Sequence, residues 1–154
     1  MGAQNFYNMA DKLRDILLAN DAVNTVTYGD ITKVATEKTS IYPLSHFVVN
    51  STQLKANTYV FSISLVCMDI IDQVNGAITD NFNGNDNQMD ILNTQLAVIT
   101  STISQFRFYN LRGQGYQLIG EPTSEQFNHR FEDDVAGWEV TFDVEVVQDI
   151  KLCS

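Results

Sequence analysis

Cysteine is scarce in this chain of 154 residues, with only two occurrences. Cys67 lies within an apolar run and Cys153 is the last residue but one, so the sequence holds neither a disulfide framework nor a CxxC motif. Disulfides are rare in reducing compartments, and buried cysteines there behave as small hydrophobic residues. The cysteine pattern therefore predicts a buried thiol and a tail thiol in a reducing cytoplasm.

Basic residues are also few. Nine Lys and Arg residues against nineteen Asp and Glu residues give a formal net charge of -10 at pH 7 and a sequence pI near 4.3. An acidic surface repels polyphosphate, which argues against ordinary DNA or RNA binding. The same charge is compatible with a protein that DNA merely passes.

Long hydrophobic runs are absent as well. The longest covers residues 65–71, contains Asp69 and is too short to cross a bilayer. The first residues lack the basic segment and apolar core of a signal peptide, so we expect a soluble intracellular product with no membrane partner. Hydrophobic residues make up 44% of the sequence. At this length, such a content predicts one domain, residues 1–154, with a substantial core.

Motifs that carry catalysis are missing. The sequence has no Gly-rich phosphate loop, no GxSxG and no Cys/His nucleophile arrangement. His46 and His129 each lie in a strand-like segment without ligand spacing nearby, which favours structural roles. Asp69 and Asp72 could form a carboxylate pair for acid–base chemistry or for a cation. Asp is also common where a strand ends and a turn begins, which is the simpler interpretation.

A cluster of Asn and Asp residues within residues 80–90 has the composition of a calcium loop. The EF-hand pattern fails, because its third position would be Phe82 and its twelfth would be Ile91 instead of Glu. A loop cation without that pattern stays open. The failed EF-hand pattern and the missing catalytic motifs together predict a protein that is not an enzyme and has no catalytic residue, cofactor or dedicated metal site.

The most periodic stretch of the chain is residues 86–108, where apolar residues recur every three or four positions. This spacing predicts an amphipathic helix with one buried face. The expected buried residues are Met89, Leu92, Leu96, Ile99, Ile103 and Phe106. The expected polar face carries Asn93, Thr94, Ser101, Thr102 and Gln105.

A second amphipathic pattern covers residues 5–19 and predicts an N-terminal helix. Its apolar stripe consists of Phe6, Met9, Leu13, Ile16 and Leu17. Residues 44–49 and 61–67 read as two strands of an antiparallel hairpin joined by a polar link. Shorter extended segments are expected within residues 23–33, 116–119 and 126–131.

Residues 138–146 alternate strictly and predict a strand with one dry and one wet face. The dry face carries Trp138, Val140, Phe142, Val144 and Val146. The wet face carries Glu139, Thr141, Asp143 and Glu145. Together the patterns predict an α+β fold, a mostly antiparallel β-sheet of about four to six strands covered by two α-helices.

Several phrases of the sequence, in this order, resemble tail terminator (tail completion) proteins of tailed bacteriophages. They are the N-terminal helix with its apolar stripe, YPLSHF at 42–47, FSISLVCMD at 61–69, ILNTQL at 91–96, and AGW at 136–138 before the final alternating strand. The resemblance covers nearly the whole chain. It implies a small α+β subunit that forms a hexameric ring, caps the finished tail tube and stops its polymerisation.

The resemblance also implies the partners and the location. A terminator contacts further copies of itself, the tail tube protein, and the neck or head-completion proteins. It belongs to the virion, is assembled in the host cytoplasm, and has neither a cofactor nor a catalytic activity. DNA passes through its channel without specific binding, and an acidic lining suits that passage. The candidate lining acids are Glu139, Asp143 and Glu145 of the wet strand face, and Glu132, Asp133 and Asp134 of the preceding loop.

Other interpretations stay open. A neck or head–tail joining protein, or the tail tube subunit, is the near alternative. From a different class, the chain would be a monomeric domain that binds a small ligand, or an enzyme of unrecognised type. A closed apolar pocket with convergent polar groups would favour that class, whereas a ring would favour the terminator.

Overall fold

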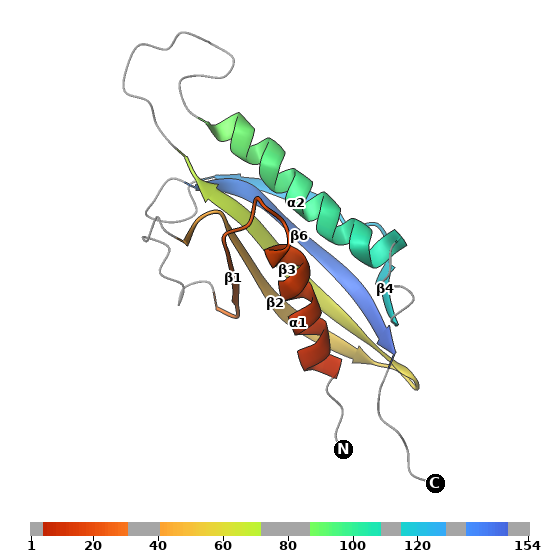
Figure 1. Ribbon diagram of the computed structural model, residues 1–154. Helices are drawn as coiled ribbons and strands as arrows, with labels where there is room; N and C mark the ends of the chain where they lie inside the picture. The colour runs from red at the N-terminus through yellow and green to blue at the C-terminus, as the bar shows by residue number, and fades with distance from the viewer. Residues whose placement is uncertain (1–4, 31–40, 72–86, 109–114, 129–134, 148–154) are drawn as a thin grey trace, which may run out of the picture.

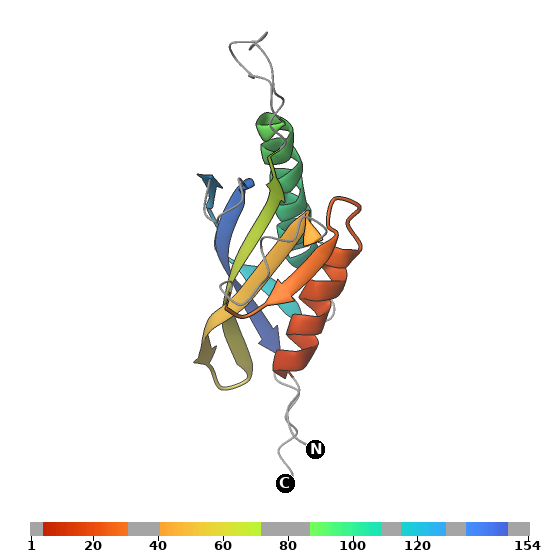
Figure 2. The same cartoon turned by 90° about the vertical axis from the view of Figure 1, so that its left-hand side faces the viewer.

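Two helices lie on the same face of a six-stranded mixed sheet (Figures 1 and 2). The computed structural model describes residues 5–30, 41–71, 87–108, 115–128 and 135–147. The predicted α+β class, with a mostly antiparallel sheet and two helices, is confirmed. Among the described residues, no helix is long and apolar enough to cross a membrane.

The sheet is built around one long hairpin and the final strand. The helices are α1 (Asn5–Leu18) and α2 (Gln88–Phe108). The strands are β1 (Thr25–Tyr28), β2 (Leu44–Leu54), β3 (Thr58–Ile70), β4 (Tyr116–Ile119), β5 (Ser124–Asn128) and β6 (Val135–Val147). The strand order is β1-β2-β3-β6-β4, and β5 pairs with β6 beside β4. Only β1 and β2 run parallel among these pairs.

The predicted hairpin is confirmed, and it is longer than its apolar pattern indicated. The sequence predicts a polar turn from residue 51 onward, yet β2 continues to Leu54 and pairs there with Tyr59. A bulge at Asn50 shifts the register between Val49 and Ser51. Beyond the bulge β2 is exposed, so its residues need not be apolar. An alternation of apolar and polar residues therefore cannot reveal that the strand continues to Leu54.

The core lies between the sheet and the helices. It consists mainly of Met9, Leu13 and Leu17 of α1, Val98, Ile99, Ile103 and Phe106 of α2, and alternate residues of β3 and β6. Phe106 packs against Phe142 and Tyr116, with ring centroids 6.0 and 6.4 Å apart. Cys67 is buried in the same core, as the sequence predicts, and burial raises the pKa of its thiol to about 12.

The predicted buried stripe of α2 is wrong in its first half. Leu96 and Met89 are 38% and 45% exposed, whereas Gln95 is buried and Ile91 packs against Ile71 and Ala136. Thr102, expected on the polar face, is also buried, because its hydroxyl donates to the Val98 carbonyl at 2.9 Å and needs no water. The buried face of α2 therefore includes polar residues and differs from the stripe that the apolar residues alone predict.

The N-terminal helix follows its pattern more closely. Met9, Leu13 and Leu17 are fully buried, whereas Phe6 is exposed and Ile16 is half-buried. The Asn5 amide donates to the Val147 carbonyl at 2.9 Å and joins the start of α1 to the end of β6.

Candidate functional site on the open face of the sheet

The sheet face opposite the two helices carries the predicted wet residues of β6. Since side chains alternate along a strand, the core position of Val140 and Phe142 turns Glu139, Thr141 and Asp143 toward the other face. Figure 2 shows both helices on the core side. Among the described elements, no helix covers the opposite face, which we call the open face.

Three of the six candidate acids therefore share one surface in the middle of the sheet. Glu139, Asp143 and Glu145 all lie on β6, which is flanked by β3 on one side and by β4 and β5 on the other. Each of these acids is half-buried among its strand neighbours. The other three candidates, Glu132, Asp133 and Asp134, lie outside the described residues.

Polar contacts cross the strands beside these acids. The Asn50 amide, placed by the bulge in β2, donates to the Ser64 hydroxyl at 2.6 Å. Ser64 in turn lies 3.1 Å from the Thr141 hydroxyl, so one row of hydrogen bonds joins β2, β3 and β6. This part of the open face therefore carries polar side chains that water can also satisfy, instead of apolar packing.

Two charged contacts of the open face involve residues of β6. Lys55 in the β2–β3 turn forms an ion pair with Glu145 at 3.3 Å. Glu125 of β5 lies directly opposite Glu139 of β6. Like charges at such cross-strand positions repel each other. The sequence could not reveal this pair, because the register between β5 and β6 is not encoded in either strand alone.

One end of the open face is apolar. Tyr42, Leu44, Met68 and Val135 form a small buried cluster there, and Val66 and Ile70 pack against it. Glu139 lies beside this apolar end, opposite Val66, whereas Asp143 and Glu145 lie farther along β6.

His46 lies buried on the open-face side of β2 and connects that strand to β1. Its Nδ1 lies 2.7 Å from the Thr27 hydroxyl and its Nε2 lies 2.7 Å from the Gly29 carbonyl. A carbonyl can only accept, so Nε2 donates and Nδ1 accepts from Thr27. Burial lowers the pKa of His46, opposed by the Gly29 hydrogen bond and the charge of Asp30. This geometry agrees with a structural role.

The remaining candidates do not assemble into a described site. Asp69 accepts a hydrogen bond from the Ile70 amide at 2.8 Å at the end of β3, as expected for a strand-ending Asp. Asp72, His129 and most of the Asn/Asp cluster lie outside the described residues. Within the described ranges, no three His, Cys, Asp or Glu side chains are grouped closely enough to hold a metal ion.

A polar hollow of about 520 Å³ lies between α1 and α2. Its lining includes Lys12, Asp15, Asn20, Ser101 and Gln105. It opens to solvent, which differs from the closed apolar pocket expected of a small-ligand site.

The chain was also compared with known proteins. No protein-family model matches it, and no curated protein matches it.

Proposed function

We propose that this chain is the tail terminator subunit of a tailed bacteriophage. In this proposal the subunit forms a hexameric ring on the end of the tail tube. The ring ends tube polymerisation and presents a surface to the neck or head-completion proteins. The subunit performs no chemistry and has no cofactor.

The observation that carries the proposal is the placement of Glu139, Asp143 and Glu145 on the open face. The core lies on the other face of the same strands, so these acids lie on the side of the sheet that would face the channel. A lining of carboxylates offers DNA phosphates no favourable contact, and DNA would slide past without being retained. The net charge of -10 acts in the same direction.

Electron microscopy of tail tubes tests this role. Tubes assembled without a terminator should keep growing, whereas adding the purified protein should cap their ends with a ring and fix their length. A ring that binds head connectors but not tube ends would instead indicate a neck or head–tail joining protein. A monomer at every salt and protein concentration that also fails to bind tubes would contradict the proposal.

A charge-reversal pair tests the channel lining. Glu139→Lys, Asp143→Lys and Glu145→Lys together should make rings retain short duplex DNA, with an affinity that falls steeply as salt is raised. The control combines Asp15→Lys, Asp21→Lys and Asp90→Lys, which changes the net charge equally at exposed positions on the helix side of the sheet. Equal DNA binding by both variants would show that total charge, rather than a lining, controls DNA passage.

A further inference from the structure

An apolar groove lies between α1 and β1. Its volume is about 230 Å³, and its lining includes Phe6, Tyr7, Tyr28 and Phe47. Tyr7 is 69% exposed and Tyr28 is 48% exposed, so large aromatic surface is left in water. The Tyr28 ring lies 6.1 Å from the Phe6 ring and 5.2 Å from the Phe47 ring, centroid to centroid. These side chains therefore form one continuous surface, which we call the aromatic groove.

A second apolar surface lies on the flank of α2 that faces away from α1. Ser101 and Gln105 line the hollow between the two helices, so they mark the flank that faces α1. At helical spacing, Met89 and Leu96 lie on the other flank. Both side chains are exposed, and Leu92 between them is half-buried. We call Met89, Leu92 and Leu96 the α2 flank.

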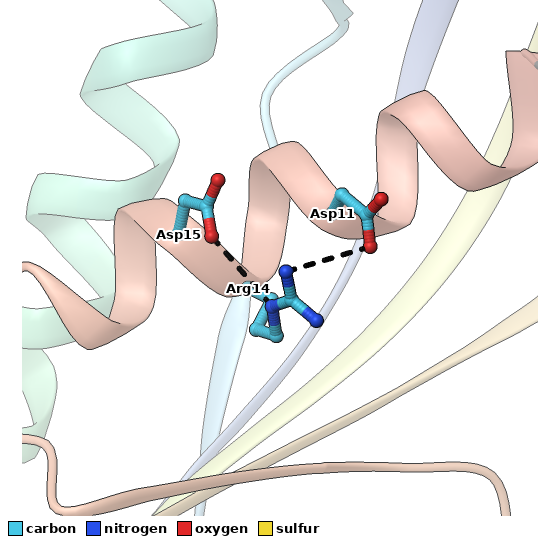
Figure 3. A network of polar contacts seen from close by, with 3 residues as sticks. All are labelled: Asp11, Arg14 and Asp15. Atoms are coloured by element: carbon cyan, nitrogen blue, oxygen red, sulfur yellow. Dashed lines mark ion pairs between the residues drawn. The ribbon is translucent and has the colours of Figure 1, made fainter.

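Neither surface carries a net charge. Two charged side chains line the aromatic groove, Asp11 and Arg14, and they form an ion pair at 3.7 Å. Arg14 also lies 3.6 Å from Asp15, so its charge is balanced within α1 (Figure 3). Residues 22–29, which include β1, hold no charged residue, and neither do residues 91–106 of α2. Charge is depleted in the same way at the centre of protein–protein interfaces.

The two surfaces lie on opposite sides of the subunit and at nearly the same level along the strands. Helix α1 contacts β1, whereas α2 contacts β6 and β4 (Figure 1). In the sheet register, the row that contains Tyr28 continues across β2 and β3 to Val140. Trp138, two residues earlier on β6, donates its indole N–H to the Leu92 carbonyl at 2.8 Å. Two residues of a strand span only about 7 Å.

We propose that the aromatic groove of one copy of this chain binds the α2 flank of the next copy. This inference rests on the proposed ring. With the open face turned toward the channel, each subunit meets its two neighbours through opposite sides, so the contact needs two different surfaces. Met89 and Leu96 of one copy would pack against Tyr7 and Tyr28 of the next, and methionine contacts aromatic rings favourably.

The charge distribution and the matching levels support a second copy as the occupant. Each copy has a net charge of -10, yet two surfaces without net charge can meet without opposing like charges. Surfaces at the same level also allow rotation without translation along the axis. Such a head-to-tail contact closes into a ring instead of growing as a spiral.

Two variants remove one surface each. Tyr7→Glu with Tyr28→Thr places a charge in the aromatic groove, and Met89→Glu with Leu96→Glu places charges on the α2 flank. Each variant should raise the dissociation constant between neighbouring subunits by about tenfold or more and lose the ring. Sedimentation velocity follows this loss at a salt concentration where the unmodified chain forms rings, and electron microscopy follows it on tube ends.

Each variant has a control with the same added charge. For the groove variant it is Leu54→Glu, which changes a 75% exposed side chain at the end of β2. For the flank variant it is Thr94→Glu with Ser101→Glu, on the side of α2 that faces α1. Both controls should keep the ring. Circular dichroism confirms that all four proteins are folded.

A mixture of the two variants tests the pairing itself. The groove variant keeps its α2 flank, and the flank variant keeps its aromatic groove. An equimolar mixture should therefore form heterodimers with one contact and nothing larger, although neither variant associates alone. A contact between two identical surfaces would instead leave one variant able to dimerise by itself.

Oxidation of Met89 tests the contact in the unmodified protein. Its thioether is 45% exposed in the single subunit and should react with hydrogen peroxide, whereas Met9 and Met68 are fully buried and should stay reduced. Ring formation should slow the oxidation of Met89 by about tenfold or more, because the neighbouring aromatic groove covers it. Peptide mass spectrometry measures the sulfoxide.

Several results would overturn the proposal while leaving the tail-terminator role intact. They are rings formed by either variant as readily as by its control, a mixture without heterodimers, and equal oxidation of Met89 in rings and in single subunits. Variants that keep the ring but lose tube binding would also overturn it, and would identify the tube as the occupant. Failure of the unmodified chain to form a ring in solution or on tube ends would overturn both proposals.

Discussion

The two faces of the sheet differ in character although the same strands form both. On the helix face, Ile63 of β3 lies opposite Phe142 of β6, and both are buried in the core. One residue earlier along β3, Ser62 lies opposite Asp143 on the open face. In the proposed ring, the alternation would place core residues on one face and channel-lining acids on the other. Substitutions on the helix face should change folding, whereas substitutions of the exposed polar residues of the open face should leave stability nearly unchanged.

The largest expected effect is on the helix face. Ile63→Ala should lower the free energy of unfolding by about 2–5 kcal/mol, because it leaves a cavity at a fully buried position. Its neighbour Ser62→Ala should change stability by less than about 0.5 kcal/mol, the usual range for surface sites. Urea unfolding followed by circular dichroism measures both. Similar losses for the two variants would remove the distinction between the faces.

The second prediction tests which side chains of α2 face the sheet. Ile99→Ala should cost about 2–5 kcal/mol, because Ile99 is buried against the sheet. Leu96→Ala should cost less than about 1 kcal/mol, because that side chain is partly in water and loses less buried area. Denaturant unfolding of the two single variants is again sufficient. A larger loss for Leu96→Ala would restore the stripe expected from the sequence.

The third prediction concerns His46 and pH. Burial lowers its pKa in the folded state, so the unfolded chain takes up this proton at a higher pH than the folded chain does. Stability should therefore be at its full value above about pH 6.5, the unperturbed pKa of His, and should fall as the pH drops through and below it. Unfolding measured from about pH 8 to pH 5 should show this slope.

His46→Gln serves as the control for that slope. The variant loses the His46 contribution but keeps His129 and all carboxylates. Its stability should therefore depend less on pH between about pH 5 and pH 6.5 than that of the unmodified protein. Identical slopes for the two proteins would contradict a lowered pKa of His46 in the folded state.

The smallest expected effect is on self-association. In the proposed ring, subunits with a charge of -10 would repel one another, so salt should promote ring closure by shortening the screening length from about 10 Å at 0.1 M to about 3 Å at 1 M. Sedimentation velocity across a salt series follows this change. Rings that dissociate as salt is raised would mean that attractive ion pairs, rather than apolar and backbone contacts, hold the subunits together.

The sequence predicted those elements whose burial is regular. The β6 alternation places Val140 and Asp143 on opposite faces. Because one face is apolar and the other is acidic, only the apolar face can be buried in the core. The inner face of α2 was predicted only in part, because Gln95 and Thr102 are polar yet buried, and hydrophobicity cannot identify them. The Glu125–Glu139 pairing was not predictable, since long-range register decides it.

Labelling inside an assembled ring tests the central claim most directly. In a Cys153→Ser background, Thr141→Cys places a thiol on the open face and Asn93→Cys places one on the exposed side of α2. Cys67 is buried, with its thiol pKa raised to about 12, and should not react. Images of rings labelled with maleimide-gold should show density in the central channel for Thr141→Cys and at the periphery for Asn93→Cys. Rings with the Thr141→Cys label outside the channel would contradict the assignment of the open face as its lining.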